Sequence, residues 1–471
     1  MDLTGDHVMV LLLAGGRGER FWPRSTRLLP KQFLPMPDEK SLLRHTFERV
    51  AGLVDPASVF VITGQEFKEL VRRDLPEVPD SNLILEPVGR NTAPALGLAA
   101  LLLAPRDPEA VLVALPADHH VVGDARFRAT IAAAVAAAAA DRLVTVGVRP
   151  TRAETGYGYI RTGPLIGERS GLPVHAVREF VEKPDVETAR RYCESGLYLW
   201  NCGILVAKLA ILREEIAAHL PEVDHLLEQM AAGNPSREGL RGQMAARVAA
   251  CFPAMPAISV DHGVLERSER VAVVPADFPW TDMGDWAALS RVLPLDERGN
   301  GVRGDALLRD CDGLVVDAFS GRLVVALGTK DLVIVDSDRA VLVCPKDRVQ
   351  EVRAVAEPAA AGGEALERSR LPEGRTIQQP WGREIWWAVA GAYAARLIQV
   401  YARRTQGAQR FRRRHETILV QRGEGRLLIG DNWCELRPGS VHALPPGVDY
   451  RIEARSDLTL IGVGTPEVAE S

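Results

Sequence analysis

An apolar run that leads straight into a glycine-rich turn opens the chain and constrains its fold most strongly. Residues 8–13 are all apolar, and Gly15, Gly16 and Gly18 follow Ala14. A short continuous apolar run favours a buried strand, and glycines let the backbone approach an anion and direct its N–H groups at it. The sequence therefore predicts a strand that opens into a phosphate-binding loop.

Cationic side chains follow the glycines. Arg17, Arg20 and Lys31 can neutralise charge that develops on phosphoryl oxygens. A surface turn with solvated arginines is the alternative, and three glycines without other signals would favour it. The Trp22-Pro23 pair and the PKQF sequence at residues 30–33 make a surface turn a poor explanation.

Two common nucleotide-binding motifs do not describe this loop. A Walker loop has Gly-Lys-Ser/Thr after its glycines, whereas Glu19 follows Gly18. A dinucleotide-binding fingerprint needs a third glycine at the position where Phe21 stands. The loop thus predicts polyphosphate binding of another kind.

The composition is that of an ordinary globular protein with an ample core. The 471 residues are 46% hydrophobic and 25% charged, with a formal net charge of -5, which suggests two or three domains and gives no indication of nucleic-acid binding. We expect no signal peptide and no membrane span, because the sequence lacks both patterns. Six scattered cysteines without a C-x-x-C pair favour reduced thiols and a cytoplasmic location.

Residues 8–290 alternate short apolar runs with helical stretches. The predicted strands are residues 8–13, 59–63, 83–85, 111–115 and 143–147, and the predicted helices are residues 41–53, 66–75, 93–103 and 126–140. This alternation predicts an α/β fold, with a mostly parallel sheet covered by helices on both faces. In such sheets ligands bind at the carboxyl ends of the strands, where the Gly15 loop lies.

The pattern changes after Trp286. Short β runs at residues 314–317, 323–327, 332–335 and 340–344 predict a small all-β unit. Residues 353–375 are rich in Ala, Glu, Gly and Pro, as is typical of a linker. Residues 376–466 return to short β runs separated by glycine-containing turns, which predict a β-barrel or sandwich.

A series of motifs extends the opening segment along the chain. In order, they are Glu86-Pro87, RNTAP at 90–94, LPADH at 115–119, TGYGY at 155–159, FVEKP at 180–184, Trp200-Asn201-x-Gly203 and WTDxGxW at 280–286. Together with the opening segment they resemble the mannose-1-phosphate guanylyltransferases, also called GDP-mannose pyrophosphorylases, over residues 8–352. The C-terminal segment resembles the cupin half of the bifunctional members, which carry a phosphomannose isomerase.

The resemblance implies a domain organisation. We expect a Rossmann-like nucleotidyltransferase domain at residues 1–290 and a small β domain, similar to a left-handed β-helix, at 291–355. A linker at 356–375 and a cupin-like β-barrel at 376–471 follow. Strand edges of the β unit and barrel could pair, so the sequence leaves a homodimer open.

The resemblance also implies the substrates, the metal and the site residues. GTP and mannose 1-phosphate would give GDP-mannose and diphosphate by in-line attack on the α-phosphorus, with Mg²⁺ as cofactor. The expected catalytic residues are Arg20 and Lys31; nucleotide-binding residues are Ala14, Gly15, Gly16, Gly18, Asn91 and Asp118; sugar-phosphate-binding residues are Gly158, Glu182, Lys183 and Asn201; and metal ligands are Asp118 and Asp282.

Each residue also has a plainer interpretation. Asp118 could cap a helix, and Asp282 and Asn201 could serve in turns. An Asp at the end of a central strand is costly to desolvate unless it meets a cation, and two carboxylates from distant segments suffice for Mg²⁺. Glu182 and Lys183 should point to opposite faces of a strand, so a salt bridge between them is not expected.

Other nearby residues have weaker assignments. We expect His119 and His120 to be structural, and Tyr157 and Tyr159 to be core aromatics. The segment at residues 91–94 is expected near the guanine or the helix behind it.

The opening motif departs from the family pattern at four positions. Glu19, Phe21, Arg24 and Thr26 stand where the family usually has Thr, Leu, Leu and Arg. We interpret these as variation within the family that could touch base preference.

The cupin-like segment has lost the metal ligands of the isomerases. Gln409, Arg414 and Glu416 match the first cupin motif, but its histidines are replaced by Phe411, Arg413 and Thr417, and Tyr450 replaces the histidine of the second motif. One carboxylate cannot make a zinc site, so we expect no isomerase activity. Either Arg413 supplies a fixed cation for an anionic regulator, or the barrel is structural or dimerising and its arginines are solvated. The second alternative is favoured.

Two other functions stay open at this point. One is nucleotidyl transfer to another sugar or from another base, for example to give GDP-heptose, because one fold serves many substrates. The other is a non-catalytic regulatory subunit, against which the presence of Arg20, Lys31, Asp118, Lys183 and Asp282 argues.

Overall fold

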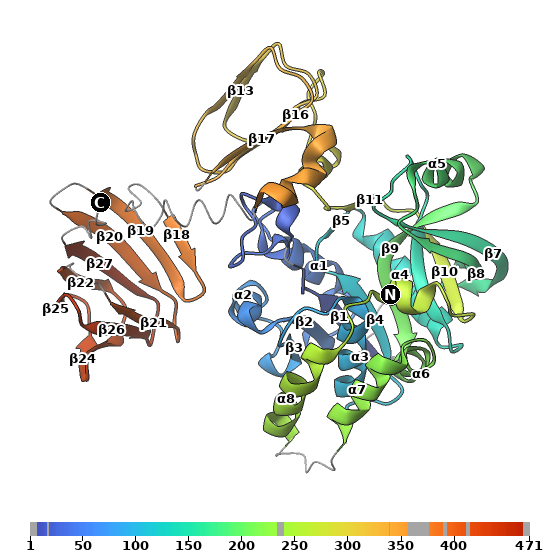
Figure 1. Cartoon of the computed structure of the whole chain (residues 1–471), viewed down its shortest axis with the longest axis horizontal. Coiled ribbons are helices and arrows are strands. Elements are labelled where there is room, and N and C mark those ends of the chain that lie inside the picture. Colours follow the sequence, from blue (N-terminus) through green and yellow to red (C-terminus); the bar gives the residue numbers. More distant parts are fainter. Residues whose placement is uncertain are drawn as a thin grey trace. The chain divides into compact units, whose positions relative to one another are not determined.

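The structure, a computed structural model, describes residues 7–16, 18–232, 240–338, 340–356, 376–389, 393–410 and 415–464 (Figure 1). The chain divides into two units. The first comprises residues 1–18 and 29–293, and the second comprises residues 19–28 and 294–471. Most of the predicted linker lies outside the described residues.

A nine-stranded sheet forms the centre of the first unit. In spatial order its strands are β3 (Leu83–Glu86), β2 (Val59–Gly64), β1 (Val8–Leu13), β4 (Val111–Pro116), β9 (Tyr198–Lys208), β6 (Leu143–Val148), β10 (Val271–Ala276), β8 (Leu172–Glu182) and β7 (Gly158–Arg169). Strand β1 pairs in parallel with β2 and with β4, β2 pairs in parallel with β3, and β6 pairs in parallel with β10. Strands β7, β8 and β9, which the sequence did not reveal, join antiparallel.

Helices cover both faces of this sheet, as predicted (Figure 1). One core contains side chains of α1 (Leu42–Val50), α2 (Lys68–Asp74) and α4 (Asp124–Ala138), and the other contains those of α3 (Thr92–Leu103), α6 (Leu209–His219), α7 (Pro221–Ala231) and α8 (Leu240–Cys251). Helix α5 (Val186–Ser195) follows β8. Within the described residues no helix is long and apolar enough to cross a membrane.

The uniformly apolar sequence of β1 has a direct structural cause. Val8, Val10 and Leu12 lie in the first core, and Met9 and Leu11 lie in the second. Successive residues of a strand point to opposite faces, and here both faces are buried. The predicted strands and helices are confirmed, with ends that shift by a few residues.

A coil of short parallel strands begins the main part of the second unit. It contains β12 (Gly301–Gly304), β13 (Ala306–Arg309), β14 (Val315–Ala318), β15 (Val324–Leu327), β16 (Leu332–Asp336) and β17 (Val341–Pro345), followed by the 3₁₀ turn η9 (Lys346–Glu351). Strands β12, β14 and β16 pair in parallel, as do β13 and β15, while β17 closes the sheet antiparallel. The predicted all-β unit is therefore a small β-helix, and the ten residues 19–28 belong to the same unit.

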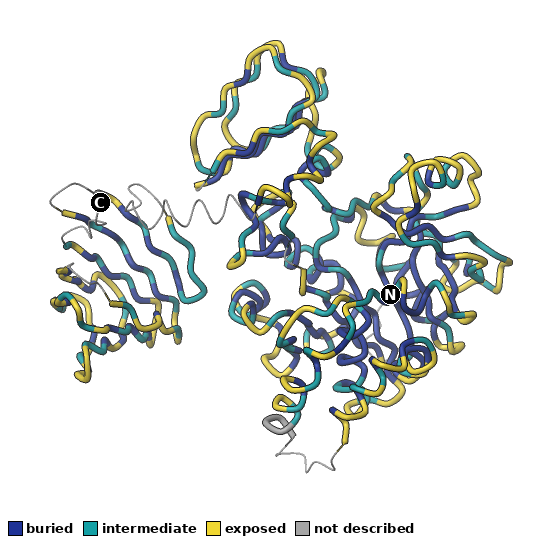
Figure 2. Tube along the Cα trace, viewed as in Figure 1, coloured by how far each residue is buried: buried dark blue, intermediate teal, exposed yellow. Residues whose placement is uncertain are grey.

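The C-terminal part consists of two antiparallel sheets. One contains β18 (Thr376–Gln379), β19 (Gly382–Val389), β20 (Ala394–Val400), β27 (Leu458–Gly464), β22 (Glu416–Arg422) and β25 (Val441–Leu444); the other contains β21 (Thr405–Arg410), β26 (Asp449–Ala454), β23 (Gly425–Ile429) and β24 (Asn432–Leu436). Ile398 and Leu460 of the first sheet share one core with Leu427 and Ile452 of the second. Figure 2 shows buried residues alternating with intermediate or exposed ones along several of these strands, as expected for a barrel or sandwich.

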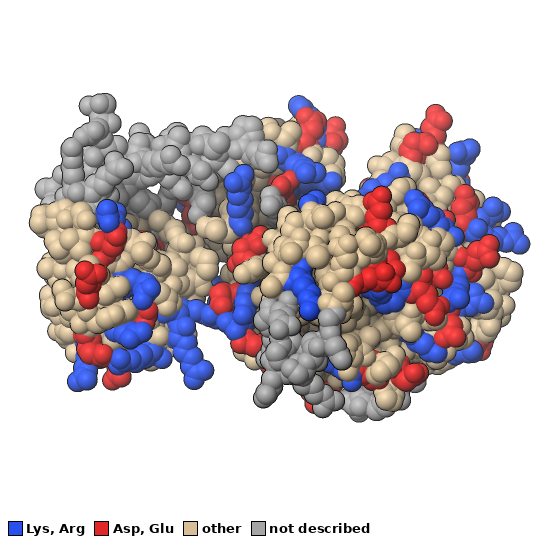
Figure 3. Space-filling model, turned by 60° about the horizontal axis from the view of Figure 1, so that its bottom comes forward, with Lys and Arg blue, Asp and Glu red and all other residues tan. Residues whose placement is uncertain are grey.

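Acidic and basic side chains are interspersed on the face shown in Figure 3. No single basic stripe dominates that view, in keeping with the formal net charge of -5. A mixed surface of this kind gives no electrostatic indication of a nucleic-acid partner.

Candidate active site

The glycine loop begins at a firmly held residue. The Ala14 N–H donates to the Ile62 carbonyl at 2.9 Å, and the Ala14 carbonyl accepts from Thr63 Oγ1 at 2.8 Å and from Gln32 Nε2 at 2.7 Å. Gly15 and Gly16, which follow, are exposed. The rigid strand end thus presents an open backbone, while Arg17 lies outside the described residues.

Gly18 must be glycine because a catalytic candidate lies against it. Its φ is +62°, and a Cβ atom there would lie 2.1 Å from Cβ of Lys31. The left-handed backbone and this close contact both exclude a side chain. The glycine loop and Lys31 therefore form one compact wall.

Lys31 lies between two carboxylates that come from distant parts of the chain. It stands at the start of the 3₁₀ turn η2 (Lys31–Phe33) and is 5% exposed. Its Nζ lies 2.8 Å from Oδ2 of Asp118 and 3.6 Å from Oδ1 of Asp282. Burial raises the pKa of the Asp118 carboxyl, the charge of Lys31 is the largest of the effects that lower it, and the net shift is downward.

A two-stranded ribbon brings the two carboxylates together. Asp118 immediately precedes β5 (His119–Val121), and Asp282 ends β11 (Trp280–Asp282). These strands pair antiparallel, with Asp282 opposite His119. The helix-cap and turn interpretations of Asp118 and Asp282 therefore give way to a shared carboxylate site.

The donor set fits a magnesium ion rather than zinc. Among the described residues no group of three or more His, Cys, Asp and Glu side chains could hold a metal. Mg²⁺ is usually held by one or two carboxylates together with phosphate oxygens. Asp118 and Asp282, already converging on one cation, match that requirement.

His119 lies beside these carboxylates and accepts a hydrogen bond from Trp280. The Trp280 indole N–H donates to Nδ1 of His119 at 3.2 Å, so the proton of the neutral ring is assigned to Nε2. That atom lies 3.8 Å from both Asp118 Oδ1 and Asp282 Oδ1. The protonated nitrogen fits the expectation that His119 is not a metal ligand.

A second group forms where β7 and β8 meet. A Cβ atom on Gly158 would lie 2.6 Å from Oε2 of Glu182, so the glycine makes room for this carboxylate. Lys183 Nζ lies 2.6 Å from Oε1 of Glu182. The prediction that these two side chains point apart is wrong, because β8 ends at Glu182 and Lys183 has a φ of +50°, which ends the strand alternation.

Asn201 is engaged mainly within the protein. Its Oδ1 accepts from Thr145 Oγ1 at 2.8 Å and from the Gly203 N–H at 3.1 Å, and its Nδ2 donates to Asp261 Oδ1 at 2.7 Å. One amide N–H is left for a sugar hydroxyl. Asn201 thereby holds Asp261 in place, which the turn interpretation did not foresee.

Asp261 is a site candidate that the sequence analysis missed. It begins a π-helical turn (Asp261–Leu265), a geometry often found at functional sites. Burial, and after it the charge of Glu182, raise the pKa of Asp261 to about 6. The only sequence signal for Asp261 is that this carboxylate directly follows residues 258–260, two of which are apolar.

Glu86, which stands in the Glu86-Pro87 motif but is not among the expected site residues, is a second candidate. It ends β3, is 4% exposed, and its Oε2 would lie 2.9 Å from a Cβ atom on Gly15. Burial and the nearby charge of Glu66 raise the pKa of Glu86 to about 7. The Glu86 carboxyl group thus contacts the start of the glycine loop.

Asn91 has a structural role at the start of α3. Its φ is +68°, and its side chain accepts from the Thr92 N–H at 2.8 Å. Thr92 Oγ1 in turn accepts from the Val260 N–H at 2.9 Å, next to Asp261. Asn91 therefore caps the N-terminus of α3.

Arg20 does not belong to the same unit as these residues. It is an exposed residue of segment 19–28, which belongs to the second unit.

In the barrel a guanidinium neutralises the glutamate that matches a metal ligand. Arg396 is 2% exposed and binds both oxygens of Glu416, at 2.7 and 2.9 Å, and Oε2 of Glu384 at 2.8 Å. Its Nη2 also donates to Tyr450 Oη at 3.0 Å, and Tyr450 donates to Gln409 Oε1 at 2.7 Å. Arg396 thus connects Glu416 to Tyr450, and Tyr450 connects both to Gln409; these three residues stand at positions of the cupin motifs.

The alternative in which Arg413 supplies a cation stays untested. Residues 411–414, and with them Phe411, Arg413 and Arg414, lie outside the described part of the chain. Arg396 was not considered as that cation from the sequence, because it lies outside both cupin motifs.

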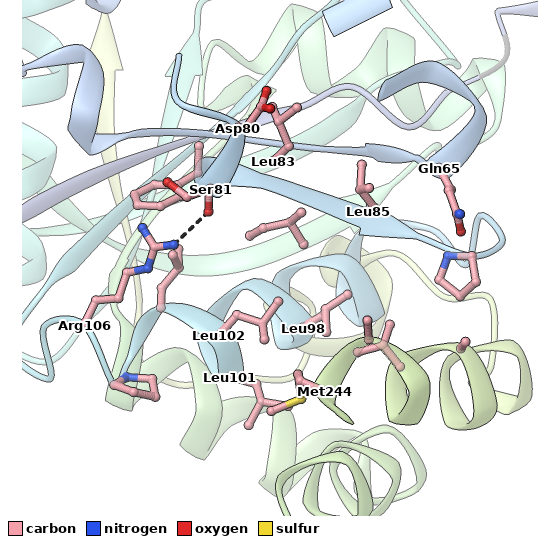
Figure 4. Close-up of a pocket in the computed structure, with 18 residues that line it drawn as sticks. Gln65, Asp80, Ser81, Leu83, Leu85, Leu98, Leu101, Leu102, Arg106 and Met244 are labelled. Atoms are coloured by element: carbon pink, nitrogen blue, oxygen red, sulfur yellow. Dashed lines mark hydrogen bonds between the residues drawn. The ribbon is translucent and has the colours of Figure 1, made fainter. Parts of the chain in front are cut away.

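A separate cavity of about 640 Å³ follows the edge strand β3 (Figure 4). Leu83, Leu85, Leu98, Leu102 and Met244 line it, from β3, α3 and α8. At one end Arg106 donates to the Ser81 carbonyl at 2.8 Å. The lining contains none of the predicted site residues, and its mainly apolar character does not suit a polyphosphate.

The class of the chain is that of the nucleotidyltransferases. A sheet with a glycine loop and paired carboxylates at the carboxyl ends of its strands is compatible with this class. Residues 9–298 match the family model described as nucleotidyl transferase, and residues 304–358 match the model described as MannoseP isomerase/GMP-like beta-helix domain.

Full-length relatives narrow the class. The chain is 34% identical to the xanthan biosynthesis protein XanB of Xanthomonas campestris pv. campestris (strain B100), over 96% of this chain and 94% of that protein. It is 35% identical to the mannose-1-phosphate guanylyltransferase of Escherichia coli K12, over 92% of this chain and 91% of that protein. The chain belongs to the mannose-1-phosphate guanylyltransferase family.

A solved structure agrees with this assignment. A crystal structure from Thermus thermophilus, described as a mannose-1-phosphate geranyltransferase, has a TM-score of 0.67 and 38% sequence identity. The match covers 75% of this chain and 99% of the Thermus chain.

Proposed function

We propose that the chain converts GTP and α-D-mannose 1-phosphate to GDP-mannose and diphosphate. The observation that carries this proposal is the convergence of Lys31, Asp118 and Asp282 beside the glycine loop, at distances of 2.8 and 3.6 Å. Relatives that cover nearly the whole chain bear the same activity in their names.

The reaction is an in-line displacement at the α-phosphorus of GTP. An oxygen of the sugar phosphate forms the new P–O bond while the bond to the β-phosphate breaks and diphosphate leaves. The nucleophile is already ionised, so no general base is needed. Charge develops on the phosphoryl oxygens, and catalysis therefore depends on positioned cations and N–H groups.

Each group has a part in this scheme. Gly15 and Gly16 are exposed, and their N–H groups are proposed to bind phosphate, while the buried ammonium of Lys31 stabilises the developing charge. Mg²⁺, held by Asp118 and Asp282 together with phosphate oxygens, would neutralise the same charge. Arg20 is the second cation proposed to act on the phosphates.

The sugar phosphate is proposed to bind at the β7–β8 group. Lys183 is 60% exposed at its side chain, so it can exchange Glu182 for the substrate phosphate. Glu182 and Asp261 then accept hydrogen bonds from sugar hydroxyls, and the free N–H of Asn201 donates one.

Base selection is proposed to rest on Glu86. Guanine presents adjacent N1–H and N2–H donors on one edge, which an ionised carboxylate can accept together. Adenine presents an acceptor at N1 and would leave the Glu86 carboxylate partly unpaired, at a cost of about 1–3 kcal/mol. This favours GTP over ATP.

We further propose that the barrel has no isomerase activity. Arg396 already neutralises Glu416 and contacts Tyr450, so the barrel interior holds a fixed organic cation among residues of the former metal site. The purified protein should not interconvert fructose 6-phosphate and mannose 6-phosphate, with or without added Zn²⁺. Turnover in that assay would refute this assignment.

The test of the main proposal is a substrate-pair assay. Diphosphate release is measured for GTP, ATP and UTP against mannose 1-phosphate, glucose 1-phosphate and a heptose 1-phosphate, each with Mg²⁺ and with EDTA. GTP with mannose 1-phosphate and Mg²⁺ should be the best combination. A better heptose substrate would favour the alternative sugar, and silence of every pair would favour a regulatory subunit. The homodimer and the cytoplasmic location stay predictions.

A further inference from the structure

The four departures from the family's opening motif lie together in the second unit. Glu19, Phe21, Arg24 and Thr26 fall within residues 19–28, which cluster with residues 294–471 rather than with the sheet. The turn η1 (Glu19–Phe21) packs on η9 of the β-helix. Their position within this segment gives no support to the suggestion that they tune base preference.

A fully buried ion pair holds this segment on the β-helix. Arg24 Nη1 lies 2.9 Å from Oδ2 of Asp317, and their side chains are 3% and 0% exposed. The other oxygen, Oδ1, accepts from Arg303 Nε at 2.7 Å and lies 2.6 Å from Nη2. The Arg24 guanidinium also lies 3.8 Å from the centre of the Phe319 ring.

Further contacts make the segment compact. Phe21 is fully buried, and Glu19 lies 2.7 Å from Nε of Arg353. The Arg24 and Ser25 N–H groups both donate to the Phe21 carbonyl, at 2.9 and 2.8 Å. Arg20 is exposed within this anchored turn.

The segment is covalently continuous with the proposed catalytic wall. Glu19 follows Gly18, whose backbone lies against Lys31, and Leu28 precedes Leu29, which packs against the core of the first unit. Any freedom of residues 19–28 therefore reaches Arg20, which this segment carries.

We propose that Arg24 and Asp317 are positioning residues for nucleotidyl transfer, and that their buried ion pair makes the β-helix the support of the loop segment that carries Arg20. This inference rests on the proposed function of Arg20. Two of the residues that depart from the family pattern, Glu19 and Arg24, form ion pairs with residues of the β-helix unit. These departures therefore belong to the contact between the segment and the β-helix.

Two substitutions test the anchor by different routes. Asp317→Asn removes the carboxylate that both arginines share, and Arg24→Gln leaves the Asp317–Arg303 pair intact, so the second variant is informative even if the first folds poorly. Hydrogen exchange of the amides of residues 19–28 should be faster in each variant. The kcat for GDP-mannose formation should fall by roughly 10- to 100-fold, because small misplacements of a catalytic group are costly.

The double variant separates positioning from independent damage. If both residues act through one ion pair, Arg24→Gln/Asp317→Asn should have a kcat no lower than that of the poorer single variant. Multiplicative losses would overturn the proposal.

Asp336→Asn is the matched control. Asp336 ends β16, the strand next to β14, and is also buried, at 2% exposed. Its carboxylate is paired with Arg322. This control should leave exchange at residues 19–28 and kcat unchanged. The same effect from Asp336→Asn and Asp317→Asn would show general damage to the β-helix and overturn the proposal.

The two proposals can fail separately. If the wild-type protein makes no GDP-mannose, the proposed function fails, and hydrogen exchange still tests the anchor. If the wild type is active and the anchor variants exchange and turn over like wild type, the anchor fails.

Discussion

Nζ of Lys31 lies 2.8 Å from Oδ2 of Asp118, although 87 residues separate the two along the chain. The contact joins the turn after the glycine loop to the end of the central strand β4, and Asp282 completes it from a third segment. The buried ammonium of Lys31 can donate hydrogen bonds to phosphate oxygens, and the two carboxylates are groups of the kind that hold a divalent cation.

Replacing this lysine should mainly slow the chemical step. Lys31→Met keeps the length of the side chain and removes its charge, so the developing charge on the phosphoryl oxygens loses a partner. We expect kcat to fall by roughly 10²–10³-fold. Steady-state kinetics with GTP and mannose 1-phosphate would measure it, with Lys40→Met, an exposed lysine paired with Glu48, as the control. Unchanged turnover would remove Lys31 from the mechanism.

Loss of one carboxylate should weaken magnesium binding rather than the fold. In Asp282→Asn the metal retains only Asp118 and substrate oxygens, so the Mg²⁺ concentration for half-maximal activity should rise at least about tenfold. Titrations of activity and of Mg²⁺-induced tryptophan fluorescence would measure it. Asp277→Asn changes an exposed carboxylate in the same region and should behave as wild type. Identical titrations for both variants would contradict a metal role for Asp282.

The affinity for GTP should depend on the ionisation of Glu86. Its pKa of about 7 means that the carboxylate is mostly ionised at pH 8 and mostly protonated at pH 6. If the ionised form accepts the guanine N–H groups, kcat/KM for GTP should fall by about tenfold for each pH unit below 7. Glu86→Gln should flatten this profile and lower its plateau. Glu66→Gln should move the inflection to lower pH, because the charge of Glu66 contributes to the raised pKa; an unmoved inflection would assign the profile to another group.

Asp261 should make the folded state less stable as pH rises from about 4 to 6. Its folded pKa of about 6 exceeds the unfolded value of about 3.9, so the folded state binds more protons in this window. The free energy of unfolding therefore falls with rising pH, by on the order of 2–3 kcal/mol from this group. Asp261→Asn should lose that contribution. Urea unfolding of both proteins at pH 4.5 and 7 would reveal it, and an equal difference at both pH values would contradict it.

The Arg396 cluster should matter for the barrel and not for nucleotidyl transfer. Arg396→Met leaves Glu416 and Glu384 buried without their guanidinium, which costs about 3–5 kcal/mol when one partner of a buried pair is removed. Calorimetry should show the barrel melting at lower temperature while kcat for GDP-mannose formation is retained. Arg426→Met, which breaks an exposed pair with Glu453, should cost less than about 1 kcal/mol. If EDTA lowers the melting temperature of the wild-type barrel instead, a bound metal stabilises it.

The strands and helices that the sequence predicted correctly are those with a distinctive local pattern of apolar residues. The apolar runs of β1, β2 and β4 and the periodicity of α1 and α4 predicted their elements closely, because strands buried on both faces and helices on a sheet have distinctive residue patterns. The antiparallel strands β7, β8 and β9 escaped, since their exposed and buried residues follow no single period.

Chain order and residue type determined the family, the glycine loop and most of the proposed site residues. Only the tertiary structure decided which of them meet. Register on a two-stranded ribbon joins Asp282 to Asp118, the end of β8 turns Lys183 back on Glu182, and packing places Arg396 on Glu416 and Arg24 on Asp317. Apart from the neighbouring pair Glu182–Lys183, these contacts join residues that no local spacing relates, because a buried charged side chain is stable only where the fold brings it a partner.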